Sequence, residues 1–157
     1  MTGDAPFEDI GRKSPARGVH IYSGQPTIVL LTVCTDGRKP WLADPVVHEH
    51  LRAAWQTARA WLVGHYLLMP DHLHLFCAPH HLNFTLEKWV TFWERQFRRS
   101  HKDPNAGWQP HPFHHRLRRE ESYGDKWNYV RENPLREGLA RHAGDWPFQG
   151  MMNLLRW

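Results

Sequence analysis

The chain has 157 residues, of which 41% are hydrophobic, and a formal net charge of +4 at pH 7. This size and apolar content fit one globular domain with a substantial core. No apolar run is long enough to cross a bilayer, and residues 1–10 lack the pattern of a secretion signal, so we expect a cytoplasmic protein without membrane partners. The two cysteines, Cys34 and Cys77, are expected to be buried and reduced.

The basic residues are clustered and lie among aromatic ones. Cations beside flat rings suit single-stranded nucleic acid, because phosphates need positive charge and unstacked bases need stacking partners. The alternative is that the nine tryptophans belong to the core and the arginines to a solvated face, and for Trp89 and Trp93 we favour the core. The candidate DNA-binding cations form two groups, Arg95, Arg98, Arg99 and Lys102, and then Arg116, Arg118 and Arg119.

Residues 1–24 show no periodicity and carry several cations, which predicts an irregular basic arm able to touch phosphates. Residues 25–157 form a single predicted domain. The β-branched, apolar run 27–35 predicts a central strand that ends at an Asp-Gly turn. Asp44 followed by proline predicts a helix start, and the apolar stripe that follows extends this helix to about Ala58.

Residues 61–69 and 72–78 predict a β-hairpin whose turn is Pro-Asp. Side chains alternate across a strand, so His72, His74 and Phe76 lie on one face and the intervening apolar residues on the other. At about 3.3 Å per residue the two histidines are roughly 6.6 Å apart at Cα, close enough to share one ion. A histidine on a strand is more often a satisfied polar residue, so this pair needs a second feature.

The remaining pattern completes an α+β fold. Apolar residues at helical spacing from Leu86 to Phe97 predict a second amphipathic helix, and residues 108–117 allow one more edge strand. A helix over 120–132 should stop before Pro134, and the tail packs back on the domain. This order is that of a ferredoxin-like sandwich, an antiparallel sheet with two helices on one face, followed by a C-terminal tyrosine-bearing helix. The histidines would then look out from the uncovered face.

The C-terminal helix offers that second feature. Tyr129 and Asn133 are four residues apart, so they should project from one helical face about 6 Å apart along the axis. An amide oxygen is an acceptable ligand for a hard divalent ion, and a phenol oxygen is a nucleophile once its proton, of pKa about 10, is lost. The alternative is a tyrosine that packs at a helix end.

Three motifs occur in one order: MPDHLHL at residues 69–75, WQPHPFHHRLRREESY at 108–123 and YVRENPLREGLA at 129–140. Together they resemble the REP-associated tyrosine transposases, a branch of the single-tyrosine HUH transposases. The resemblance covers roughly residues 27–148. The chain departs from the family's pattern at His114, where the family often has an acid.

The resemblance implies a metal-dependent endonuclease and strand transferase for single-stranded DNA. His72 and His74 would bind Mg²⁺ or Mn²⁺, Asn133 would be the third ligand, and Tyr129 would attack the scissile phosphate to leave a 5′-phosphotyrosine and a free 3′-hydroxyl. Relatives recognise short palindromic repeats folded as hairpins, so the partner would be hairpin DNA held by the basic groups. His115 would position DNA or relay a proton.

Two other functions stay open. The first is a binding module that kept the fold and grips hairpin DNA or RNA without cutting it. The second is a structural metal protein, whose melting temperature would fall on chelation. The sequence allows either a monomer or a homodimer.

Overall fold

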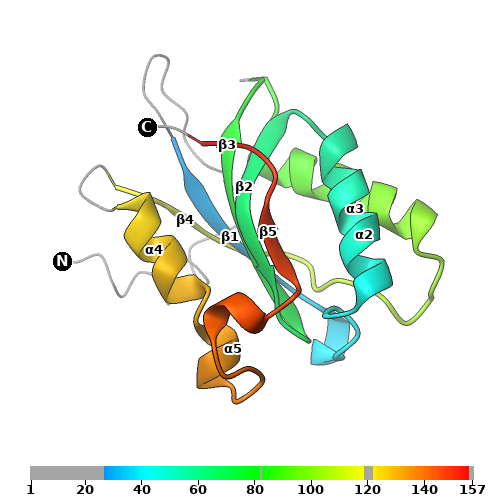
Figure 1. The fold of residues 1–157 in the computed structure, drawn as a ribbon. Helices are drawn as coiled ribbons and strands as arrows, with labels where there is room; N and C mark the ends of the chain where they lie inside the picture. Colours follow the sequence, from blue (N-terminus) through cyan, green and yellow to red (C-terminus); the bar gives the residue numbers. More distant parts are fainter. Residues whose placement is uncertain (1–26, 82, 119–121, 156–157) are drawn as a thin grey trace.

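The computed structural model describes residues 27–81, 83–118 and 122–155 (Figure 1). The predicted arm at 1–24 and Arg119 lie outside the described residues. The elements are β1 (Val29–Cys34), η2 (Asp36–Arg38), α2 (Pro45–Thr57), β2 (Trp61–Leu68), β3 (His72–Pro79), α3 (Leu86–Ser100), β4 (Phe113–Arg116), α4 (Tyr123–Val130), α5 (Asn133–Arg136), η3 (Ala143–Asp145) and β5 (Gln149–Met151). None of the described helices combines the length and apolar composition that a membrane span requires.

The sheet is antiparallel and its strand order is β4-β1-β3-β2-β5. The first four strands have the order of a ferredoxin-like fold, which confirms the predicted α+β sandwich. The Met69 amide donates to the His72 carbonyl oxygen at 2.8 Å, so Pro70-Asp71 is the turn of the β2–β3 hairpin, as predicted. Strand β5 was not predicted.

Local signals set the starts of the helices that cover the sheet. The Asp44 carboxylate accepts from the Val46 and Val47 amides at 3.0 and 3.1 Å, and Pro45 follows it as the first helical residue of α2. The Thr85 hydroxyl accepts from the Lys88 amide at 3.2 Å and begins α3 in the same way. Both predicted helices are therefore confirmed.

The main core lies between one face of the sheet and helices α2 and α3. Leu73, Leu75 and Cys77 point from β3 into this core, where they meet tryptophans of both helices. The placement of Trp89 and Trp93, which are 1% and 0% exposed, confirms that they are core residues. Cys34 and Cys77 are buried free thiols, as predicted.

The second face of the sheet is less open than predicted. Helix α4 and the C-terminal tail lie over it (Figure 1), and Val130 and Leu155 join a smaller core with Phe76. The sequence did not predict this cover, because the apolar periodicity of α4 and of the tail is too weak to indicate which face of the sheet they pack on. This cover leaves the His72 and His74 end of β3 only partly buried.

The predicted helix over 120–132 is shorter in the structure and is followed by a second one. Helix α4 ends at Val130, and the four-residue helix α5 begins at Asn133 with Pro134 inside its first turn. Asn133 is thus not on the same helix as Tyr129, and the prediction that both project from one helical face is wrong. The cause is Pro134, which has no amide proton to continue the helix.

Candidate active site

His72 and His74 lie side by side on the sheet face opposite helices α2 and α3. On the neighbouring strand β1, Cys34 is opposite His72 and Thr32 is opposite His74. The two imidazole ring centroids are 4.9 Å apart, and the ring planes are inclined by 83°. The predicted pairing of two rings on one strand face is therefore present in the structure.

One nitrogen of each ring is held by a neighbouring side chain. His72 Nδ1 lies 2.8 Å from Asp71 Oδ1, and Asp71 Oδ2 accepts from Arg38 Nε at 3.1 Å. His74 Nδ1 lies 2.8 Å from the Thr32 hydroxyl oxygen. If each Nδ1–H donates, both Nε2 lone pairs are left for a ligand. This is the usual arrangement behind metal-binding histidines.

The pKa values of His74 and Asp71 are both shifted in the direction that favours binding of a metal ion by the histidine pair. Burial, followed by the charges of His72 and Arg136, lowers the pKa of His74 to about 3, so its ring stays neutral at physiological pH. Burial alone would raise the pKa of Asp71, but its hydrogen bonds with His72 and Arg38 outweigh this and lower it. Asp71 therefore stays ionised, and its carboxylate can accept a hydrogen bond from His72 Nδ1–H.

Tyr129 is at the end of α4 and its side chain is 61% exposed. Arg136 of α5 folds back over it. The guanidinium carbon is 4.2 Å from the centre of the phenol ring, and Nη2 donates to the Tyr129 carbonyl oxygen at 2.8 Å. The charge of Arg136 also lowers the pKa of His74, so the arginine that contacts Tyr129 acts electrostatically on one ring of the histidine pair.

Asn133 is partly buried, and its side-chain oxygen accepts from Arg136 Nη2 at 2.9 Å. A cation therefore already occupies one lone pair of the predicted third ligand. In the described part of the chain no three His, Cys, Asp or Glu side chains cluster as a metal site. An ion held by the two imidazoles would complete its shell from Asn133, water or DNA. Such an open set of nitrogen and oxygen donors fits a catalytic divalent ion.

The structure does not bring the predicted DNA-binding cations to the histidines. Arg95, Arg98, Arg99 and Lys102 are exposed on or just after α3, which covers the opposite face of the sheet. Arg116 is opposite Val29, which in turn is opposite Cys77, so the second group is at the far end of β3 from His72. Arg118 follows it and is exposed. Both groups stay predicted phosphate contacts, away from the histidine pair.

The two histidines of β4 point to different faces. His115 is opposite Leu30, which faces the smaller core, so it shares the face of the histidine pair; it is only 8% exposed, which leaves little of its ring for DNA. His114 is opposite Leu31, which faces the main core. Burial lowers the pKa of His114, while the charge of Glu87 raises it and that of His115 lowers it.

Four residues of the site were missed by the sequence reasoning: Thr32, Asp71, Arg38 and Arg136. Asp71 stands directly before His72, and Arg136 is seven residues after Tyr129, so both had a positional signal. Thr32 and Arg38 had none, because their places depend on the pairing of β1 with β3 and on the loop that follows β1.

Comparisons with known proteins agree with the resemblance in the sequence. The chain is 25% identical over 91 residues to the REP-associated tyrosine transposase of Escherichia coli K12, and this match spans 57% of the chain and about half, 54%, of that relative. A solved REP-associated tyrosine transposase bound to a REP hairpin has the same fold, with a TM-score of 0.68, 21% identity and coverage of 83% of this chain and 80% of that one. A crystal structure of a candidate transposase from Deinococcus radiodurans R1 aligns with a TM-score of 0.46 and 19% identity, over 77% of this chain and 98% of that one. No family model matches the chain.

Proposed function

We propose that the protein nicks and transfers single-stranded DNA through a 5′-phosphotyrosine on Tyr129, with hairpin-forming DNA as its substrate. The likeness to REP-associated tyrosine transposases supports DNA as the partner, since one solved relative holds a REP hairpin. The observation that carries the chemistry is the histidine pair. Both Nδ1 atoms are held at 2.8 Å by Asp71 and Thr32, so both Nε2 atoms are available on the same sheet face.

His72 and His74 would hold a divalent ion, Mg²⁺ or Mn²⁺, together with Asn133, water or a DNA oxygen. The bound ion would supply Lewis acidity, which polarises the phosphate and stabilises the leaving 3′-oxygen. Asp71 and Thr32 orient the two rings, and the ionised Asp71 carboxylate, which can only accept, favours the proton of His72 on Nδ1. The low pKa of His74 keeps its ring neutral and so available as a ligand.

Tyr129 would attack the scissile phosphate with its phenol oxygen. The bond from phosphorus to this oxygen forms while the bond from phosphorus to the 3′-oxygen breaks, and the phenol proton ends on the 3′-hydroxyl. One phosphodiester replaces another, so no energy source is required. Arg136 holds the tyrosine by its ring and its carbonyl oxygen, and its positive charge favours the phenolate as it develops.

The test is covalent trapping. Protein is incubated with end-labelled hairpin DNA carrying single-stranded flanks and Mn²⁺, and the adduct is resolved by denaturing electrophoresis. We expect an adduct in the wild type that is absent in Tyr129→Phe and with a chelator. Tyr123→Phe is the matched control, because this phenol is on the same helix but its oxygen accepts from the His65 backbone amide at 2.9 Å instead of facing solvent. An adduct that persists in Tyr129→Phe and disappears in Tyr123→Phe would refute the assignment.

One observation favours a second function, a module that binds hairpin DNA without cutting it. Arg136 already donates to the Asn133 side-chain oxygen, which weakens this residue as a metal ligand. Such a module would bind a labelled hairpin equally well in the wild type and in Tyr129→Phe, and would form no adduct with Mg²⁺ or Mn²⁺.

A further inference from the structure

A hollow separate from the histidine site lies between the end of α2 and the first half of α3. Its volume is about 690 Å³, within the range of pockets that hold small organic groups. It is on the sheet face opposite His72 and His74, because α2 and α3 both cover that face. Aromatic and basic side chains line it, among them Arg59, Phe84, Lys88, Trp89, Phe92 and Arg95.

Two phenylalanines in this hollow are exposed to solvent. Phe84 is 48% exposed and Phe92 is 43% exposed, whereas Trp89 beside them is 1% exposed. Exposed aromatic rings grouped at the edge of a cavity are typical of a ligand-binding or protein-binding surface. The flat faces of two rings suit a flat ligand, which an unpaired base provides.

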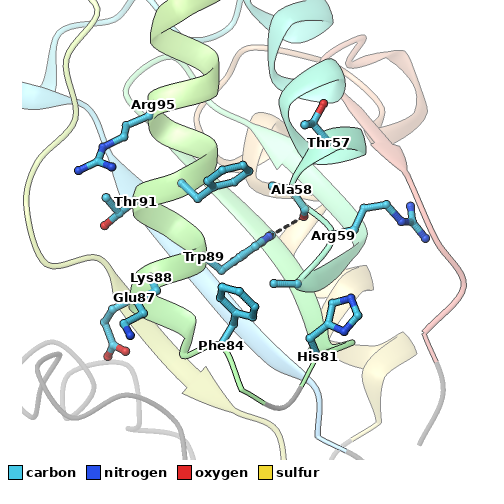
Figure 2. Close-up of a pocket in the computed structure, with 12 residues that line it drawn as sticks. Thr57, Ala58, Arg59, His81, Phe84, Glu87, Lys88, Trp89, Thr91 and Arg95 are labelled. Carbon is cyan, nitrogen blue, oxygen red and sulfur yellow. Dashed lines mark hydrogen bonds between the residues drawn. The ribbon is translucent and has the colours of Figure 1, made fainter.

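Two buried indole hydrogen bonds tie the walls of the hollow together. The Trp89 indole nitrogen donates to the Ala58 carbonyl oxygen at 2.8 Å, which joins the two helices across its floor (Figure 2). The buried Trp61 indole donates to the Phe84 carbonyl oxygen at 2.9 Å, so the loop that carries Phe84 is anchored from below. A preformed cavity binds a ligand without the entropy cost of ordering its walls.

The charges around the rings indicate an anionic ligand. Arg59 lies on one side of Phe84 and Trp89, and Lys88 and Arg95 lie on the other (Figure 2). Glu87 is the one carboxylate among the lining residues, and its charge acts on His114 of β4. Three cations around two exposed rings match a nucleotide, whose base is flat and whose phosphates are negative.

The cations continue from the hollow along the outer face of α3. Lys88, Arg95 and Arg99 follow one another at intervals of seven and four residues, which places them on one stripe of α3, and Lys102 comes two residues after the helix ends. At about 1.5 Å per residue the helical stripe is about 16 Å long. The end of α3 lies toward the turn of the β2–β3 hairpin. His101 stacks on Trp41, and the backbone amide of the next residue, Leu42, donates to the Pro70 carbonyl oxygen of that turn.

We propose that this hollow binds an unpaired base of single-stranded DNA on the exposed rings of Phe84 and Phe92, with the adjoining phosphates on Arg59, Lys88 and Arg95. The choice of DNA as the nucleic acid rests on the proposed function. The site itself is separate from Tyr129 and needs no metal ion. It would hold a stretch of strand on the side of the protein away from the cleavage chemistry.

The test measures binding of fluorescein-labelled (dT)12 by anisotropy in the presence of EDTA, so that cleavage is not involved. We expect Phe92→Ala and Phe84→Ala each to weaken binding about ten-fold, as loss of one stacking partner does, and Phe92→Tyr to restore it. Arg95→Gln should weaken binding and lower the slope of log affinity against log salt by about 0.7. Arg141→Gln is the matched control, since Arg141 is exposed, does not line the hollow and belongs to neither group of predicted phosphate contacts.

A second measurement locates the base directly. A (dT)12 strand with one 5-iododeoxyuridine is irradiated with the protein, and the crosslinked peptide is identified by mass spectrometry. A crosslink within residues 83–95 supports the proposal. Crosslinks only elsewhere, unchanged affinity in both alanine variants, or a dimer that Phe92→Ala dissociates would overturn it. Loss of the Tyr129 adduct with an intact crosslink would refute only the proposed function, and the reverse result only this site.

Discussion

Thr32→Val tests the metal site most directly, because it replaces the hydroxyl with a methyl group and keeps the shape of the side chain. In the structure this hydroxyl oxygen is 2.8 Å from His74 Nδ1. Loss of such a partner typically weakens metal binding about 10- to 100-fold, or about 1.4 to 2.7 kcal/mol. The cost of leaving a ring N–H unpaired in a partly buried site, about 1 to 3 kcal/mol, has the same size.

The assay is the Mn²⁺ concentration that half-saturates adduct formation at fixed DNA. We expect this concentration to rise at least ten-fold in Thr32→Val and to return towards the wild-type value in Thr32→Ser. Thr27→Val is the matched control, because Thr27 is buried just before β1 and its hydroxyl has no hydrogen-bond partner among the described residues. If the half-saturating Mn²⁺ concentration is unchanged in Thr32→Val, the Thr32 hydroxyl does not orient the His74 ring for an ion, and the proposed coordination by His74 fails with it.

Two further predictions concern Arg136 and Glu94. Arg136→Ala should lower the single-turnover rate of adduct formation about five-fold, since an exposed cation–π contact contributes about 0.5 to 1 kcal/mol, and Arg136→Lys should recover only part of it; an unchanged rate would contradict a positioning role. Burial raises the pKa of Glu94 to about 7, and the positive charge of Arg98 only partly opposes this. Between about pH 4.5 and 7 the folded protein therefore binds one more proton than the unfolded chain. Its stability falls as the pH rises through this window. Glu94→Gln should therefore raise the free energy of unfolding by about 1 to 2 kcal/mol at pH 8, a value reduced from the full shift because the side chain is partly exposed. At pH 4.5 the substitution should leave the free energy of unfolding nearly unchanged. Denaturant melts at the two pH values measure both effects, and equal effects would contradict the raised pKa.

The parts of the fold that were predictable are those where apolar periodicity is strong. The stripe from Leu86 to Phe97 and the alternation around His72 and His74 each allow one arrangement that buries the apolar side, and both are present in the structure. Strand β5 has no such pattern, because its three residues include a glycine and a glutamine. It pairs with β2 only because the chain returns there after Trp146, whose indole donates to the Leu68 carbonyl oxygen at 2.9 Å.

The candidate site was predictable in its residue types but not in its geometry. Period-two alternation is enough to place two imidazoles on one face. It does not give the register between β1 and β3, which sets Thr32 opposite His74. The break between α4 and α5 was also hidden, because the residue before a proline can end a helix or only kink it. The sequence therefore predicted Asn133 on the same helix as Tyr129, whereas in the structure it begins the next helix, α5.

Arg136 explains how two helices without a common axis can still act as one unit. Its guanidinium touches the Tyr129 ring, the Tyr129 carbonyl oxygen and the Asn133 side chain, so it fixes the end of α4 against the start of α5. The charge of Arg136 also lowers the pKa of His74 on β3. Under the proposed function, a DNA phosphate beside Tyr129 would attract the guanidinium and loosen its hydrogen bond to the Asn133 side-chain oxygen. DNA binding would then free this oxygen as a candidate third metal ligand.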